Sequence, residues 1–549
     1  MTTSPGVPRG TLFALLAAFA LAWFCNLGVR HLVKPDEGRY AEIPREMLAS
    51  GDWLTPRLNG YKYFEKPPLQ YWATAASFVV FGMNEWTARL WPGLTGFLGV
   101  LLVYWAGNRL FAPPAGLLGA AVTASSALYA IVGHLLTLDM ALSFFMSASV
   151  FAFAVAQAEP GEAGRRRWML CGWAAMALAV LTKGLVGVVL PAGAVAAYIL
   201  VQRDWRLLRR LYLVRGGLLF LAIAAPWFVM VSLANPEFAR FFFIHEHFER
   251  FLTKEHDRYQ PAWYFLPVLL IGIVPWLVAL LPGLQNAWRR TGAEAFDARR
   301  FLLLWCAAVF VFFSVSDSKL VAYILPLFPA LALLIGDYLR SAGRRALLTQ
   351  SAVAAALALA LALAAPYAPE YASEAVPPSL LRDYVPWLIA GGLALAAGGA
   401  LAAILFSRGM RASAVLSLAC GGLTLSQLAL SGHESLAPSL SAYHIVQQIR
   451  DQVKPDTPFY FVDTFDHTAL FYLGRKVTMV SVTDELADPV RRAPRDFLPD
   501  TAAFARAWEA DRDAFAMFNV NDLPVFLKAH PVPMRVVAVD PRRVIVRKP

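Results

Sequence analysis

The sequence predicts a polytopic α-helical membrane protein that carries a small α/β domain at its C-terminal end. Its composition supports this fold class, since 58% of the 549 residues are hydrophobic and only 16% are charged, and the mean hydropathy is +0.51. The spacing of apolar windows agrees, because a helix needs about 20 residues to cross about 30 Å of hydrocarbon. Thirteen such windows can be drawn. We therefore expect about thirteen transmembrane helices within a membrane domain of residues 1–432.

The windows follow one another with mostly short connections. They cover residues 11–30, 87–107, 113–132, 136–157, 168–183, 185–202, 213–234, 262–284, 301–316, 320–339, 346–366, 384–406 and 412–432. The first window follows Arg9 and is short enough for a signal peptide. No convincing cleavage site of small residues follows it, so we expect an uncleaved first helix.

The net charge of +11 lies in the membrane part, because residues 433–549 carry 15 Lys and Arg against 15 Asp and Glu. Clustered arginine in alternate short loops is the positive-inside pattern and not a nucleic-acid footprint. With the N-terminus in the cytoplasm, an odd number of helices places these loops inside and residues 433–549 in the periplasm of a bacterium. The loops concerned hold Arg165 to Arg167, Arg203 to Arg210, Arg289 to Arg300, Arg340 to Arg345, and Arg408 with Arg411.

The loop at 31–86 is assigned to the outer side and begins with a dense charged run. Ile43, Met47 and Leu48 have the spacing of an amphipathic helix that lies on the membrane surface. Residues 69–81 are apolar but short, which predicts a second interfacial helix. A second large outer loop covers residues 235–261.

Residues 433–549 change character and show turn signals between short β-rich runs. Strands are predicted at 459–462, 477–482, 515–518, 535–539 and 544–546, and helices near 443–453 and 501–509. The four cysteines of the whole chain lack paired spacing, so neither a disulfide framework nor a zinc ribbon is expected.

Several ionisable residues lie at the outer ends of predicted membrane helices, and such residues mark function by default. With the topology above, Asp139, Lys183, Asp317 and Lys319 face the same side as Asp36-Glu37. The lysines could instead reach toward headgroups, Asp139 could pair structurally, and Asp36-Glu37 could cap a helix. Convergence on one side favours a site, and Asp36, Glu37 and Asp139 are its candidate catalytic carboxylates.

The residue types indicate the substrate. Arg and Lys suit phosphate oxygens, carboxylates suit proton transfer or a substrate amine and hydroxyls, and tyrosines suit a sugar face at an interface. A lipid phosphate that carries a sugar meets all three requirements. The candidate substrate-binding residues are Arg39, Tyr40, Glu42, Tyr63, Lys66, Lys183, Asp317, Lys319 and Tyr323.

A metal site is a further possibility in the loop 235–261. His245 and His247, together with Glu65, could hold a divalent ion such as zinc or magnesium. The spacing matches no known zinc motif, and surface histidines near headgroups are common.

The run DEGRYAEIPREMLASGDWLTPRLNGYKYFEKPPLQYW at 36–72 closely resembles the first periplasmic loop of the bacterial 4-amino-4-deoxy-L-arabinose transferases. These belong with the protein O-mannosyltransferases in the C-type glycosyltransferase superfamily. LTKG at 181–184 and SDSKLVAYILPLFPALALL at 316–334 resemble further blocks, and the resemblance covers residues 12–345.

The resemblance implies an inner-membrane pentosyltransferase of a Gram-negative bacterium. Such an enzyme moves aminoarabinose from undecaprenyl phosphate to lipid A phosphates at the periplasmic face, which confers resistance to polymyxin. It also implies that Asp36 is the catalytic acid position, that Arg39, Lys66 and Lys183 balance phosphate charge, and that Lys319 and Tyr323 bind the donor. We expect a monomer.

Chemistry qualifies the role of Asp36. A phosphate acceptor is ionised at neutral pH, so Asp36 could orient a substrate without removing a proton. Three alternatives remain open: a transferase acting on protein or another glycan, a transporter of lipid-linked sugars, and a membrane scaffold. A transporter is disfavoured because no internal repeat is visible and the charges gather at one face, not at the midplane.

Overall fold

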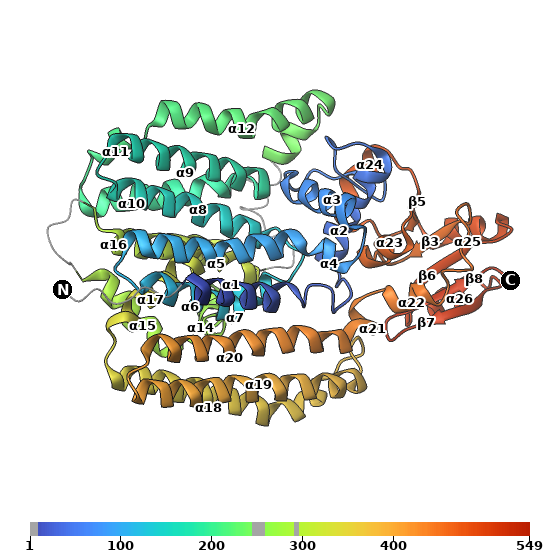
Figure 1. Cartoon of the computed structure of the whole chain (residues 1–549). Helices are drawn as coiled ribbons and strands as arrows, with labels where there is room; N and C mark the ends of the chain where they lie inside the picture. Colours follow the sequence, from blue (N-terminus) through green and yellow to red (C-terminus); the bar gives the residue numbers. More distant parts are fainter. Residues whose placement is uncertain (1–8, 244–258, 290–295) are drawn as a thin grey trace.

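The computed structural model describes residues 9–243, 259–289 and 296–549. Long helices run side by side in one body, and a mixed β-sheet lies at one end of it (Figure 1). Within the described residues, eight helices are long and apolar enough to cross a membrane, and a bent pair at 262–288 makes a ninth if it counts as one span. The predicted class, a polytopic helical membrane protein with a C-terminal α/β unit, is confirmed.

The predicted number of spans was higher. Each of the thirteen windows holds helix, but four of them fail the requirements of length and composition. Two are short, one is interrupted at Ser126, and one begins with a charged turn. These are α1 (Arg9–Phe24), α10 (Val186–Gln202), the pair α6 (Ala115–Ser125) and α7 (Ala127–Val132), and α9 (Glu162–Lys183). Hydropathy windows register apolar composition but not the breaks between helices.

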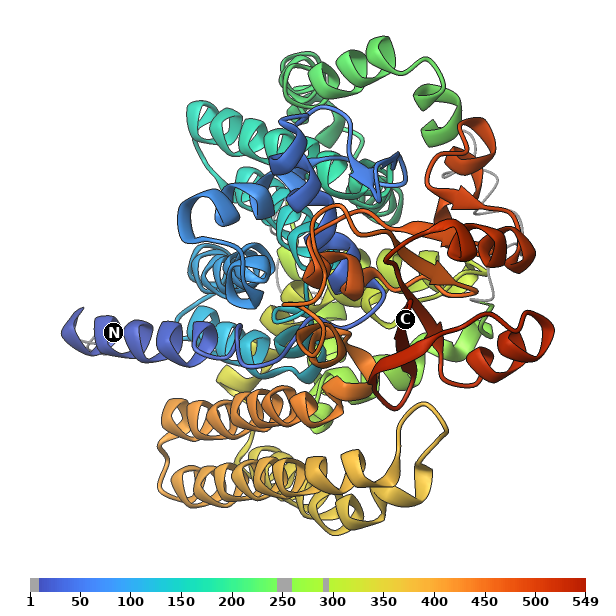
Figure 2. The same cartoon turned by 90° about the vertical axis from the view of Figure 1, so that its right-hand side faces the viewer.

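The remaining helices of the membrane part follow in chain order. Figure 2 shows α18, α19 and α20 as a layer of their own at one edge of the bundle. The elements are α5 (Leu90–Leu110), α8 (Asp139–Ala158), α11 (Leu207–Arg210), α12 (Leu213–Ala234), η2 (Ala262–Tyr264), α14 (Phe265–Gly272), α15 (Leu277–Trp288), α16 (Ala298–Val315), η3 (Val321–Leu327), α17 (Phe328–Ser341), α18 (Arg344–Ala364), η4 (Ala365–Tyr371), α19 (Pro378–Ser407), α20 (Arg411–Gly432) and η5 (His433–Leu436).

Small residues allow the bundle helices to approach closely. A Cβ added to Gly336 of α17 would lie 2.4 Å from the backbone nitrogen of Gly119 in α6. Close backbone contact at small residues is a common mode of packing inside membranes, where van der Waals contact between helices replaces the hydrophobic drive.

The first outer loop folds into a compact unit at the end of the bundle. It comprises α2 (Asp36–Ser50), β1 (Arg57–Leu58), β2 (Tyr61–Lys62), α3 (Leu69–Phe81) and α4 (Glu85–Ala88). Asn59 and Gly60 join the two strands with φ of 51° and 78°, as a tight hairpin turn requires. Both helices predicted in this loop are present, and α2 buries ten of its residues.

The C-terminal unit is built on a six-stranded sheet in the order β5-β4-β3-β6-β8-β7. The strands β5, β4, β3 and β6 are parallel, whereas β8 runs antiparallel to both β6 and β7. Its elements are α21 (Ala437–Leu440), α22 (Tyr443–Gln447), β3 (Phe459–Val462), α23 (His467–Leu473), β4 (Thr478–Val480), η6 (Asp484–Leu486), α24 (Ala487–Arg492), β5 (Phe497–Leu498), α25 (Thr501–Ala510), β6 (Phe515–Asn519), α26 (Asp522–Ala529), β7 (Arg535–Val539) and β8 (Arg543–Arg547).

The two faces of this sheet bury different side chains. Phe459 and Phe461 of β3 point into one apolar core, and Tyr460 and Val462 point into another, as the two-residue period of a strand requires. The first core is shared with the outer loop, because it also contains buried residues of α2, the hairpin and α3. The loop and the C-terminal sheet therefore fold as one hydrophobic unit.

Candidate active site

Glu37 anchors the outer loop through a buried ion-pair cluster. Its carboxylate accepts two hydrogen bonds from Arg30, at 3.1 and 3.2 Å, and two from Arg89, at 2.7 and 2.8 Å. The backbone N–H groups of Leu136 and Val33 donate to it as well. Burial alone would raise the pKa of Glu37, but the two guanidiniums hold that pKa well below its usual range. The predicted catalytic residue Glu37 thus has a geometry that favours a positioning role.

Helix α2 meets α23 of the C-terminal unit at Gly38. A Cβ on Gly38 would lie 2.5 Å from the backbone nitrogen of Thr468 and 2.6 Å from the carbonyl carbon of His467. Only glycine permits this approach of two backbones. The motif therefore places α2 directly against the C-terminal unit.

A chain of charged groups crosses this contact. Arg39 donates to Asp36 at 3.3 Å, and its Nε lies 2.7 Å from Glu485 Oε1, which also lies 2.7 Å from His467 Nε2. Burial alone would raise the pKa of Glu485, but His467 and Arg39 hold it well below its usual range. Asp36 is the exposed end of the chain, with 43% of its side chain accessible.

Three buried tyrosines line the same region. Burial raises the pKa of Tyr40, Tyr63 and Tyr71 well above the usual value, so these side chains remain neutral phenols. Within the described residues, the hydroxyl oxygens of Tyr63 and Tyr71 are buried and have no hydrogen-bond partner. A buried hydroxyl without a partner costs about 1–3 kcal/mol, which a polar ligand or water would recover.

The ends of two membrane helices add an ion pair. Lys183, the last residue of α9, lies 2.5 Å from Asp139, the first residue of α8. The Lys183 ammonium also sits 4.7 Å above the ring of Tyr323 in η3. The Asp36 carboxylate is close enough to act electrostatically on Lys183. Of the predicted convergent residues, Asp36, Asp139 and Lys183 thus lie close together, and Tyr323 lies beside them.

A cavity of about 290 Å³ opens beside these groups. It lies between the hairpin, the chain after α12 and the C-terminal helix α24, and Tyr63, Glu65 and Glu485 are on its wall. Four basic side chains also line it, which are Arg57, Lys62, Arg492 and Arg495. Four acidic side chains, Glu65, Glu237, Glu485 and Asp488, line it as well, so the cavity presents both signs of charge next to Tyr63.

The remaining predicted residues lie in several places. Glu42 is fully buried and pairs with Arg45 through two contacts of 2.6 Å. Lys66 donates to the backbone oxygen of Glu65 at 2.8 Å, and both side chains are largely buried. The predicted metal ligands His245 and His247 lie outside the described residues.

The block around Lys319 also differs from the expected arrangement. The buried Lys319 ammonium donates to the backbone oxygens of Gln260 and Ser316. Asp317 is exposed. Lys319 thus stabilises the turn that contains it, and Asp317 forms no ion pair among the described residues.

Sequence reasoning missed Arg30, Arg89, His467 and Glu485. Arg30 and Arg89 are single arginines near helix ends, and their local context gives no sign of the carboxylate they share. His467 and Glu485 lie more than 400 residues from Arg39, so only the fold brings them together.

The arrangement suits transfer between anionic groups. It combines cations that can meet phosphate oxygens, an accessible carboxylate and neutral phenols that can donate hydrogen bonds. It lies where the ends of membrane helices meet extramembrane structure, so a lipid tail and a polar headgroup could both be accommodated.

Comparisons with known proteins find family matches for two parts of the chain. Residues 10–242 match the family model described as dolichyl-phosphate-mannose-protein mannosyltransferase, and residues 445–548 match the one described as aminoarabinose transferase C-terminal domain. The crystal structure of ArnT from Cupriavidus metallidurans bound to undecaprenyl phosphate is 39% identical, covers 98% of both chains and gives a TM-score of 0.93.

Two curated relatives carry the name undecaprenyl phosphate-alpha-4-amino-4-deoxy-L-arabinose arabinosyl transferase. The protein from Edwardsiella ictaluri is 35% identical over 60% of this chain, and the one from Pseudomonas aeruginosa strain UCBPP-PA14 is 37% identical over 60%. The matched regions span 59% and 60% of those proteins' own lengths.

Proposed function

This chain belongs to the aminoarabinose transferase (ArnT) family, and we propose that it transfers 4-amino-4-deoxy-L-arabinose from undecaprenyl phosphate to phosphate groups of lipid A. It is a membrane glycosyltransferase in this proposal, and it contributes to resistance against polymyxin and other cationic peptides by removing negative charge from lipopolysaccharide. The lipid-linked donor is supported by the related structure, which holds undecaprenyl phosphate.

The observation that carries this proposal is the open polar surface around Asp36. The other acids near it are occupied, since Glu37 binds two arginines, Asp139 binds Lys183, and Glu485 binds Arg39 and His467. Asp36 has one long contact and substantial exposure. Beside it, the hydroxyl groups of Tyr63 and Tyr71 are buried and have no hydrogen-bond partner among the described residues.

In the proposed step, an oxygen of the acceptor phosphate forms a bond to the anomeric carbon of the sugar. The bond between that carbon and the undecaprenyl phosphate oxygen breaks, and its electron pair stays on the departing phosphate. The acceptor is already an anion, so the step needs no general base. Stabilising the departing phosphate should be the larger contribution, and we assign that role to Arg39, Lys66 and Lys183.

Asp36 has an orienting role in this scheme. A carboxylate can bind the sugar hydroxyls and the 4-ammonium group of aminoarabinose, and the hydrogen bond from Arg39 fixes its direction. Tyr40 lies on the same helix, with Asp36 among the groups that keep its phenol protonated. The aromatic rings would then cover the sugar while the bases hold the phosphates.

The chain is a multi-pass membrane protein, and we place it in the inner membrane with the site facing the periplasm. Helix α9 has 22 residues and is therefore roughly 33 Å long. Lys183 at its end belongs to the site, whereas Arg165 to Arg167 lie in its first turns. The arginine cluster and the site are thus at opposite ends, which supports a cytoplasmic N-terminus and a periplasmic C-terminal domain.

Reconstitution tests the proposal. The purified protein is supplied with aminoarabinosyl undecaprenyl phosphate and lipid A, and the products are measured by mass spectrometry. We expect lipid A that is heavier by one aminoarabinose residue. No such product, together with transfer of another sugar to a protein or glycan, would reject the assigned substrates and favour the alternative that the match of residues 10–242 to mannosyltransferases suggests.

The metal prediction for Glu65, His245 and His247 stays a prediction. Glu65 is largely buried beside Lys66 on the cavity wall, so a divalent ion there would adjoin the substrates, but no step above depends on it. Activity that survives thorough chelation would argue against a catalytic zinc or magnesium ion. The monomeric state also stays a prediction, which light scattering of the purified protein would check.

A further inference from the structure

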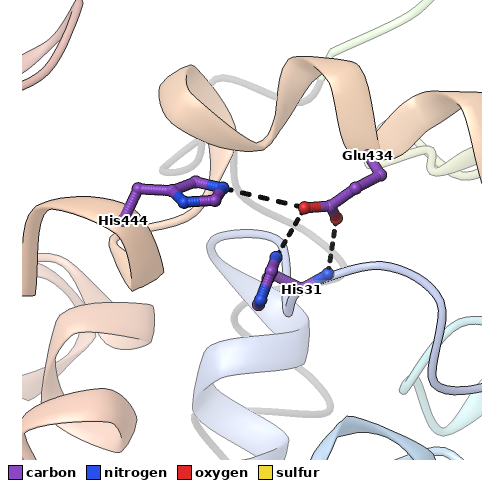
Figure 3. Close-up of side chains that lie close together, drawn as sticks. All are labelled: His31, Glu434 and His444. Atoms are coloured by element: carbon purple, nitrogen blue, oxygen red, sulfur yellow. Dashed lines mark hydrogen bonds and ion pairs between the residues drawn. The ribbon is translucent and has the colours of Figure 1, made fainter. Parts of the chain in front are cut away.

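A second group of polar side chains lies where the membrane helices meet the C-terminal unit. His31 follows α1, Glu434 is in η5 directly after α20, and His444 is in α22. Figure 3 shows the two imidazole rings directed toward the carboxylate between them. None of these residues contributes to the arrangement around Asp36. The three come from segments up to 413 residues apart in the sequence.

The distances are close to those of a metal site. His31 Nδ1 lies 2.6 Å and His444 Nε2 lies 3.7 Å from Oε1 of Glu434. One ligand atom from each residue falls within 4.8 Å of the others. Ligand atoms around a tetrahedral zinc ion with bonds of 2.0–2.1 Å are about 3.4 Å apart. Small side-chain rotations would therefore suffice to enclose an ion.

Neighbouring groups already orient the potential ligands. The backbone N–H of His31 donates to Glu434 Oε2 at 2.8 Å, which leaves Oε1 directed at the rings. The ring of Tyr443 stacks on the His31 ring with centroids 3.6 Å apart. Such outer contacts fix ring orientation and raise metal affinity in known sites. His444 is 44% exposed, so an ion could enter from solvent.

We propose that His31, Glu434 and His444 form a zinc-binding site with a fourth position open to water. Two imidazoles and one carboxylate are a ligand set that zinc accepts. On binding, His31 Nδ1 and His444 Nε2 each donate a lone pair to the ion, and any proton held on those nitrogens is released or resides on the other ring nitrogen.

The site would join three parts of the molecule. It connects the segment that leads into α2, the turn η5 after the last long helix, and helix α22 of the C-terminal unit. His31 precedes Asp36 by five positions in the chain. A bound ion would therefore restrain the start of α2 and stabilise the folded chain by mass action. This proposal does not depend on the proposed transferase activity.

Zinc binding to the full-length protein in detergent tests the site. The unaltered chain, His444→Ala, Glu434→Gln and the control His530→Ala are stripped with chelator, equilibrated with zinc chloride and analysed for bound zinc. We expect His444→Ala and Glu434→Gln each to hold one zinc fewer per chain than the unaltered protein and than His530→Ala. Comparing differences in this way keeps zinc bound elsewhere from affecting the result.

A second measurement separates binding from folding. Zinc should raise the thermal midpoint of the unaltered chain and of His530→Ala by more than that of His444→Ala, while all three have the same midpoint in chelator. Equal zinc content in all four proteins, or an equal zinc-induced shift in all of them, would overturn the proposal. His444 is substantially exposed, so its removal should leave the fold intact.

Discussion

At the scale of single residues, burial separates the acids that hold the fold from the acid that can meet a substrate. Glu37 and Asp36 are neighbours in sequence, yet 3% of Glu37 is exposed against 43% of the Asp36 side chain. The sequence predicted both as catalytic because both are carboxylates and they occupy adjacent positions in the same motif. Their different partners, two buried arginines for Glu37 and one partly exposed pair for Asp36, come from tertiary structure alone.

Asp36→Asn should abolish transfer while leaving stability unchanged. The variant keeps the size of the side chain but loses the charge that orients the sugar, so we expect kcat/KM to fall at least about 100-fold. Turnover is measured with purified donor and lipid A, and thermal unfolding is followed in parallel. Asp317→Asn is the control, because Asp317 is also exposed and forms no ion pair among the described residues. An Asp36→Asn variant with most of its activity would remove Asp36 from the site.

Glu37→Gln should mainly lower stability, in contrast to Asp36→Asn, which should lower activity alone. It leaves Arg30 and Arg89 buried without their counterion, which costs about 3–5 kcal/mol. We therefore expect a large fall in the thermal midpoint or a failure to accumulate folded protein. A stable and inactive Glu37→Gln variant would instead show that Glu37 acts in catalysis.

The tyrosine hydroxyls give a third distinction. Tyr63→Phe and Tyr71→Phe each remove a buried hydroxyl that has no partner in the described part of the chain, so neither should lower stability. If the hydroxyls bind substrate, each variant should lose about tenfold in kcat/KM, the equivalent of one neutral hydrogen bond. Tyr371→Phe, at an 84% exposed position, serves as the control. Unchanged kinetics in both variants would place the substrate elsewhere.

At the scale of elements, α2 connects the site to the C-terminal unit. Its motif residues face two ways: Asp36 and Arg39 toward the site, and Gly38 and Arg45 toward α23 and the residue that follows it. The amphipathic pattern predicted a helix here but assigned its apolar side to the membrane surface. The C-terminal unit covers that side instead, which hydropathy cannot distinguish from lipid.

Gly38→Ala should disrupt the contact between α2 and α23. The added methyl group would lie 2.5 Å from the backbone of Thr468, where no flexible side chain can move aside. We expect a loss of about 1–3 kcal/mol in stability together with reduced transfer, because Arg39 and Glu485 would be displaced from one another. Thermal unfolding and turnover are measured together. Gly193→Ala, at an open helical position, should be neutral or slightly stabilising.

At the scale of the whole molecule, the class of fold was predictable from the sequence, whereas the breaks within helices and the contacts of the C-terminal unit were not. Apolar windows and arginine-rich loops are properties of the local sequence, so they can be recognised without the structure. Packing between distant segments determines where a helix breaks, as at Ser126, and brings Arg39 into contact with Glu485. The unit at 433–549 shares a hydrophobic core with α2, which links it structurally to the outer loop.

This link predicts how the molecule responds to acid. Glu37, Asp466 and Glu485 are each buried against arginine or histidine, and these partners hold their pKa values below the usual range in spite of burial. A group with a depressed folded pKa stabilises the fold above its unfolded pKa, about 4, and loses that contribution as the pH falls further. We therefore expect the thermal midpoint to be steady from pH 7 to about 5 and to fall steeply below about 4.

A comparison of variants tests whether this loss of stability in acid arises at the contact between α2 and the C-terminal unit. Glu485→Gln has no carboxyl to protonate at the position that joins Arg39 to His467, so it should start from a lower midpoint at pH 7 and fall less steeply in acid. Asp488→Asn changes a neighbouring, more exposed carboxylate of α24 and should keep the steep dependence of the unaltered chain. Identical acid profiles for the unaltered chain and Glu485→Gln would show that this contact does not limit stability, and would leave Glu37 and Asp466 as the groups whose protonation unfolds the protein.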